Sequence, residues 1–96
     1  MDTLDSDMCV KILKMCGISV TPVRQLLLNM ILQRGYAPFS AKEILDEIKD
    51  KKLPISSSAV IVNLKLFSIR RLIRPDTITT HFGAGRPGVK YVLVKK

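Results

Sequence analysis

Near its C-terminus the chain reads Thr77-Ile78-Thr79-Thr80-His81-Phe82-Gly83-Ala84-Gly85-Arg86-Pro87-Gly88-Val89-Lys90-Tyr91-Val92-Leu93-Val94, two strand-like runs on either side of a glycine-rich turn. The three glycines and one proline of residues 83–88 cannot continue a helix, and they supply the unusual dihedral angles of a hairpin tip. The first run extends back to Arg71. We therefore predict a β-hairpin with strands at about residues 71–81 and 89–95 and with Arg86 at its turn.

Capping residues and apolar periodicity upstream of this hairpin predict helices. Thr21-Pro22 opens one of them, because Thr is a good N-cap and Pro suits the first helical position. Ser40 and Glu43 have the spacing of a capping box, and Ser56-Ser57-Ser58 offers caps for a further helix. Helices are predicted at about residues 5–16, 21–34, 40–51 and 56–69.

The first and last of these helices carry specific expectations about burial. Asp5 or Ser6 should cap the first helix, and Gly17 should end it. Its buried stripe is predicted to contain Met8, Ile12 and Met15, together with Cys9 and Cys16 as reduced thiols. In the last helix, Val60, Leu64 and Phe67 recur at helical spacing and should face the core. The β-branched run of residues 60–62 favours a strand, but the preceding caps favour a helix.

Length and charge limit the classes of function. At 96 residues the chain forms one domain. Residues 1–48 carry five Lys/Arg against six Asp/Glu, a net charge of −1, whereas residues 49–96 carry eleven against two, a net charge of +9. A polyanionic partner is expected for the second half, because binding to phosphates releases condensed counterions. No apolar run is long enough to cross a bilayer and no signal peptide is recognisable, so a cytoplasmic location without membrane contact is expected.

Helices followed by a basic β-hairpin are the order of elements in a winged helix, an α+β fold used mostly to grip double-stranded DNA. Three short patterns extend this similarity. Gly17 with Thr21-Pro22-Val23-Arg24 matches a Gly and Thr-x-x-Arg pattern at a helix entry, and residues 40–44 match Ser-Ala-x-Glu-Ile. Residues 58–64 align with Ala-Thr-Val-Tyr-Arg-x-Leu. In these patterns the chain resembles the DNA-binding domain of the ferric-uptake-regulator family, which implies a bacterial transcriptional regulator, usually a repressor.

The chain departs from that family in two respects. Ile61 and Val62 stand where the family has the Tyr and Arg that contact bases and phosphates. The chain also stops at Lys96, where the family would begin its metal-sensing dimerisation domain, so it is either a stand-alone short relative or a fragment. One His and two distant Cys cannot supply a closed zinc site, so no metal or cofactor is expected.

Candidate DNA-binding residues follow from the predicted elements. At the start of the last helix, Ser57 and Ser58 either bond phosphates or only cap the helix. Ile61 and Val62 either pack on thymine methyl groups or face the core or a protein partner. Arg86 on the wing should enter the minor groove or hold a phosphate, unless it is merely solvated. Phosphate contacts are also expected from Lys14, Lys65 and Lys90.

No nucleophile, base and orienting group occur together, so we expect no enzyme and no small-molecule substrate. The sequence predicts double-stranded DNA binding and transcriptional regulation. The alternative is a winged helix that binds protein through Ile61 and Val62, including a second copy of the chain.

Overall fold

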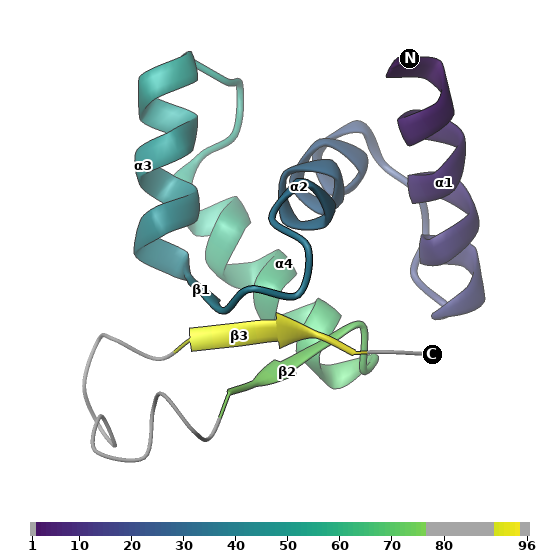
Figure 1. Ribbon diagram of the computed structural model, residues 1–96. Helices are drawn as coiled ribbons and strands as arrows, with labels where there is room; N and C mark the ends of the chain where they lie inside the picture. Colours follow the sequence, from purple (N-terminus) through teal and green to yellow (C-terminus); the bar gives the residue numbers. More distant parts are fainter. Residues whose placement is uncertain (1, 77–89, 95–96) are drawn as a thin grey trace.

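A computed structural model describes residues 2–76 and 90–94 of the chain. These residues form an α+β arrangement of four helices and three short strands (Figure 1). The elements are α1 (Asp2–Met15), α2 (Pro22–Gln33), β1 (Phe39–Ser40), α3 (Ala41–Lys51), α4 (Ser57–Ile69), β2 (Ile73–Pro75) and β3 (Lys90–Leu93). No helix among them is both long and apolar enough to span a membrane.

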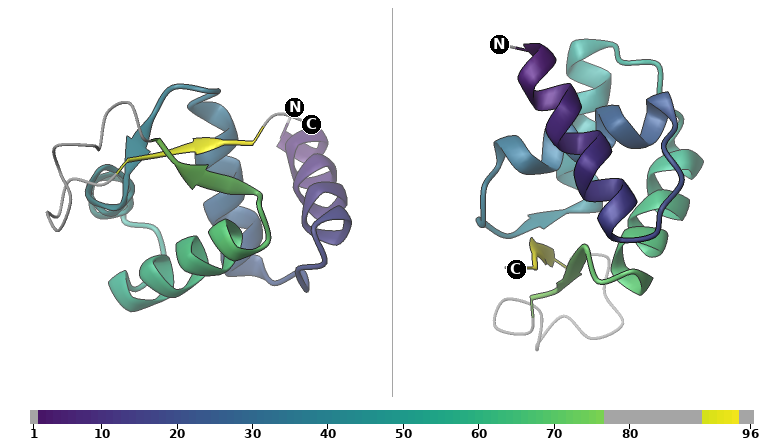
Figure 2. Two further views of the ribbon diagram at one scale, coloured as in Figure 1. Left: turned by 90° about the horizontal axis from the view of Figure 1, so that it is seen from below. Right: turned by 90° about the vertical axis from the view of Figure 1, so that its right-hand side faces the viewer.

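The three strands form an antiparallel sheet in the order β1-β3-β2, with the helices on one side of it (Figures 1 and 2). Tyr91 of the central strand pairs with Phe39 of β1 on one side and with Pro75 of β2 on the other. The rings of Phe39 and Tyr91 lie 6.1 Å apart, between their centroids. Strand β1 was not predicted from the sequence, because a two-residue strand has no periodicity of its own and exists only through its pairing with β3.

Three of the predicted helix starts are confirmed by their N-caps. The side chains of Thr21, Ser40 and Ser56 each accept a hydrogen bond, at 3.2 Å, from the backbone N–H three residues later. These bonds satisfy N–H groups that have no partner within the helix. The helix observed for α4 also shows that the caps and the buried face outweigh the strand preference of its β-branched residues.

The predicted start and buried face of α1 were partly wrong. The helix begins at Asp2, so Asp5 and Ser6 lie within it and do not cap it. Nothing in the first residues breaks a helix, and acidic residues are favourable near a helix N-terminus. Met8 and Met15 are 49% and 67% exposed, whereas Cys9 and Leu13 are fully buried. The helix carries two adjacent apolar stripes, and the one containing Cys9 and Leu13 packs into the core.

The core lies between the helices and the inner face of the sheet. Its fully buried side chains include Val60 and Phe67 of α4, as predicted, and Leu64 is almost fully buried. The other elements and the segments between them contribute Cys9, Leu13, Ile18, Leu27, Leu28, Met30, Ile31, Phe39, Ile44, Ile48, Ile55, Leu72, Ile73 and Val92.

The first predicted strand is shorter than expected at its beginning. Arg71 adopts a left-handed conformation (φ 63°), and its N–H bonds the carbonyl of Ser68. The N–H of Leu72 bonds the carbonyl of Phe67 at 2.8 Å. These bonds form a Schellman turn that ends α4, so the strand starts only at Ile73. The predicted strand residues 77–81, 89 and 95, and the turn at 83–88, lie outside the described residues.

Candidate nucleic-acid interface

Helix α4 presents one face to the core and the opposite face to solvent. The buried positions 60, 63, 64 and 67 recur at helical spacing. On the other side of the helix, the same periodicity relates the exposed positions Ser58, Ile61, Val62, Lys65 and Ile69, and Ser57 of the first turn is exposed as well. The three aliphatic side chains of this outward face are 50%, 62% and 69% exposed, in the order Ile61, Val62 and Ile69. The outward face therefore combines exposed apolar surface with one cation, and α4 contains no Asp or Glu.

Three neighbouring elements support α4 from behind. It packs against α2, α3 and β2. In the left view of Figure 2, α4 runs along one edge of the molecule, and α2 lies between α4 and α1. The outward face is thus carried by a helix whose position is fixed by the core.

A hydrogen-bonded clamp joins α4 to α2 and to the loop before α2. Arg24 Nε donates to Asn63 Oδ1 at 2.9 Å, while Arg24 Nη1 donates to the carbonyl and the hydroxyl of Ser19. Asn63 Nδ2 donates to the carbonyl of Ala59 at 2.8 Å. Arg24 thus bonds an amide and a serine, and its role in the described structure is to hold α4 in place.

The first turn of α4 carries the two candidate serines. The N-cap is Ser56, so capping does not account for Ser57 and Ser58, both of which are exposed. The hydroxyl of Ser58 lies 3.3 Å from that of Ser56. An open groove of about 350 Å³ runs beside this turn. Its lining residues are Thr21, Val23, Arg24, Ser58, Ala59, Val62 and Asn63.

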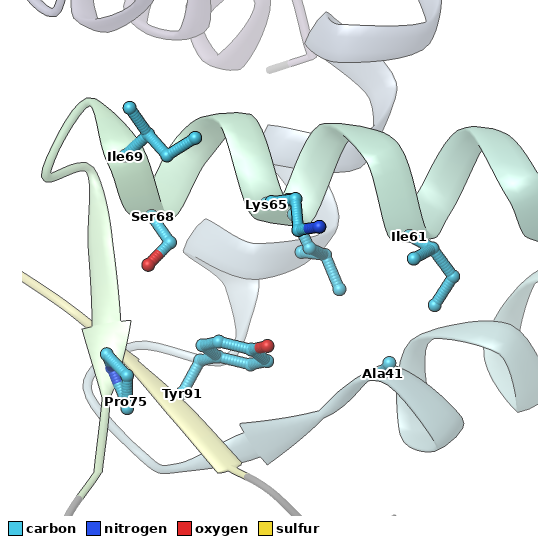
Figure 3. Close-up of a pocket in the computed structure, with 8 residues that line it drawn as sticks. Ala41, Ile61, Lys65, Ser68, Ile69, Pro75 and Tyr91 are labelled. Carbon is cyan, nitrogen blue, oxygen red and sulfur yellow. The ribbon is translucent and has the colours of Figure 1, made fainter.

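A second hollow, of about 300 Å³, separates the outward face of α4 from the sheet (Figure 3). Ile61 and Ser68 extend from α4 toward the strand that carries Tyr91. Ala41, at the start of α3, closes the side of the hollow, and Lys65 lines it as well. Ile61 and Val62 therefore each border one hollow, on opposite sides of the line through Ser58 and Lys65.

Lys90 has a partner within the protein. Its Nζ lies 2.6 Å from Glu43 Oε2, and this pair joins the start of β3 to α3. The hydrogen bond from Lys90 lowers the pKa of the Glu43 carboxyl, with a further contribution from the backbone N–H of Ser40, which is the second bond of the predicted capping box. A phosphate contact by Lys90 would have to compete with this pair.

The same cluster continues to α2. Arg34 Nη2 lies 2.6 Å from Glu47 Oε1, and Lys51 Nζ lies 2.9 Å from Glu47 Oε2. Burial works to raise the pKa of Glu47, but the hydrogen bonds from Lys51 and Arg34 outweigh it, so the pKa is lowered overall. The carboxylates of Glu43 and Glu47 thus neutralise cations of α3, of β3 and of the C-cap of α2.

Of the two remaining predicted contacts, only Lys14 lies among the described residues, and it belongs to α1 rather than to the outward face of α4. Lys14 is exposed in the last turn of α1, which packs against α2. Arg86 lies outside the described residues. Arg70 and Arg71 are exposed at the C-terminal end of α4, and the Arg70 guanidinium lies over Gly17, 3.6 Å from where a Cβ of that residue would be.

Asn63 and Ile69 were missed as residues of this region. A single amide within an otherwise apolar helical stretch was the available signal for Asn63, because a buried amide needs hydrogen-bond partners. Ile69 follows Lys65 by four residues, so the periodicity already assigned it to the outward face.

In residues 2–76 and 90–94, no group of three or more His, Cys, Asp or Glu side chains is arranged to hold a metal ion.

Comparison with known proteins gives no family assignment. No protein-family model matches the chain, and a search of curated proteins finds no match either.

Proposed function

We propose that the chain is a winged-helix domain that binds double-stranded DNA, with α4 in the major groove and the segment between β2 and β3 as the wing. The observation that carries this proposal is the outward face of α4, which is exposed to solvent and free of carboxylates. It lies in the half of the chain whose net charge is +9, from eleven Lys/Arg against two Asp. A duplex is the partner that supplies both a polyanionic surface and a groove of helix width.

The supports of α4 fit this role. A reading helix has to keep its register against the bases, and the Arg24–Asn63 clamp fixes α4 on α2. Ser57 and Ser58 lie in the first turn, where the helix dipole favours an anion, so they would contact a phosphate. Lys65 would contact the backbone further along the groove. A role in transcriptional regulation, as a repressor of the ferric-uptake-regulator type in the bacterial cytoplasm, is proposed on the sequence resemblance alone.

The test is a salt titration with a mixed-sequence duplex. Affinity should fall steeply as salt rises, and Lys65→Ala should weaken binding and reduce the salt slope by about one unit. Lys11→Ala is the matched control, because it removes the same charge from an exposed position of α1. Equal effects of the two substitutions, or no detectable binding at low salt, would contradict the proposal.

The second candidate function is protein binding, favoured by the exposed Ile61, Val62 and Ile69. Exposed aliphatic clusters of this kind often mark protein interfaces. Ile61→Ser would then dissociate a dimer or a partner complex, which light scattering would detect as a change of mass. In the DNA-binding function the same substitution leaves the mass unchanged.

A further inference from the structure

The outward face of α4 has few groups that could read bases by hydrogen bonding. Specific readout in the major groove depends mainly on Arg, Lys, Asn and Gln side chains. Within α4, Asn63 is the one amide, and it is buried, with its oxygen bonded to Arg24 and its nitrogen bonded to the carbonyl of Ala59. Polar groups on the outward face are limited to Lys65 and the first-turn serines. The face is thus equipped for apolar contact.

The major groove itself offers one apolar group, the methyl on C5 of thymine, and 5-methylcytosine carries the same group. Resting on the proposed function, we propose that α4 recognises C5-methyl groups of pyrimidines, with Ile61 and Val62 as the contacting side chains. Both side chains are at least half exposed. Each borders a hollow of about 300 to 350 Å³, large enough to admit a methyl group and the edge of its base. The expected ligand is therefore duplex DNA that is rich in thymine or methylated at cytosine.

The net charge of the protein favours methyl-bearing duplex DNA, rather than a second copy of the chain, as the partner of the outward face of α4. The net charge of the protein is +8, so two copies repel each other. Lys65 lies between Ile61 and Val62, and Arg70 and Arg71 follow at the end of the helix. A partner that covers aliphatic side chains and also satisfies these cations has to combine apolar groups with dense negative charge. Methyl groups bordered by phosphates have that combination.

The experiment compares two duplex pools of the same mixed sequence. One pool contains thymine and 5-methylcytosine, so that every pyrimidine carries the methyl group. The other contains uracil and unmodified cytosine, so that none does. Phosphate contacts are the same in both, and the ratio of the two affinities reports the methyl groups. The methylated pool should bind more tightly by about 4-fold for one contacted methyl and about 15-fold for two.

Variants assign the effect to the proposed side chains. Ile61→Ser with Val62→Ser should abolish the difference between the pools and leave the salt slope unchanged, because the phosphate contacts remain. Both positions are exposed, and circular dichroism checks that the helix content is retained. Met15→Ser, an apolar-to-polar change at an exposed position of α1, is the matched control and should preserve the difference.

Three outcomes overturn the inference, and they differ in what they mean for the proposed function. Equal affinity for the two pools, with binding that still depends on salt, would contradict methyl recognition but would still support DNA binding. Absence of binding to both pools removes the proposed function as well. A stable homodimer or a complex with an acidic peptide that is lost on Ile61→Ser would assign the outward face of α4 to a protein.

Discussion

Asn63 is the polar side chain on the buried face of α4, and it connects two parts of the chain that are 39 residues apart. Its amide has partners on both its oxygen and its nitrogen. The bond from Arg24 is charge-assisted, and bonds of this kind are stronger than those between neutral groups. At the scale of single residues, the orientation of α4 depends on this contact.

Asn63→Ala should therefore lower the free energy of unfolding by about 1–3 kcal/mol, because Arg24 Nε loses its acceptor in a partly buried site. Urea denaturation measures the change. Asn29→Ala, at a half-buried position of α2, is the matched control and should cost less than about 1 kcal/mol. Equal effects of the two substitutions would mean that the bond to Arg24 contributes nothing. DNA affinity of the Asn63 variant should also fall, since α4 is no longer held in register.

At the scale of elements, two helices are followed by a non-glycine residue in the left-handed backbone conformation. Lys52 after α3 and Arg71 after α4 adopt left-handed conformations, with φ values of 55° and 63°. At the end of α1 the corresponding residue is Gly17, with φ 73°. Glycine adopts this conformation without strain, whereas other residues lose about 1–2 kcal/mol in it.

Lys52→Gly and Arg71→Gly should each stabilise the fold, by up to about 1 kcal/mol, because the relief of strain exceeds the added entropy of the unfolded chain. Thermal unfolding measures both effects. Arg71→Gly should at the same time weaken DNA binding, since Arg71 follows the outward face of α4, while Lys52→Gly should affect binding less. A loss of stability in both variants would show that the lysine and arginine side chains contribute more than the strain costs.

The sequence could predict the helices better than the contacts between them. Caps such as Ser40 and Thr21 act within three residues, so a local pattern is sufficient to find them. The buried stripe of α1 was predicted only in part: Cys9 is buried as expected, but Met8 and Met15 are exposed, because two adjacent apolar stripes are equally periodic and only packing against α2 selects one. The outward face of α4 followed directly from the spacing of its buried residues. The clamp on Arg24 and the pairing of Lys90 could not be predicted, since they join residues 39 and 47 positions apart.

At the scale of the whole molecule, the charged cluster around α3 connects the helices to the sheet. Glu43 bonds Lys90 of β3, and Glu47 bonds Arg34 at the end of α2. Both carboxyls have a pKa lowered from their ordinary value of 4.5 in the folded state. A group with a lowered pKa stabilises the fold above its unfolded pKa, and this contribution is lost as pH falls through the folded value.

Stability should thus decline as pH falls below 4.5. The double variant Glu43→Gln with Glu47→Gln should be less stable than the natural protein at neutral pH, and the difference should shrink in acid, where the natural carboxyls are also uncharged. Urea denaturation across a pH series measures this. A difference that stays constant with pH would show that the cluster acts through shape and packing rather than through charge.

The order of the strands also has a consequence for how the protein is made. The central strand, β3, spans Lys90–Leu93, while its two neighbours precede it along the chain. Synthesis proceeds from the N-terminus, so β1 and β2 leave the ribosome before the strand that pairs with both of them. The helices can form early from local contacts, whereas the sheet has to wait for β3. Until then a nascent chain exposes two unpaired strand edges, and the arrival of one short strand completes the sheet.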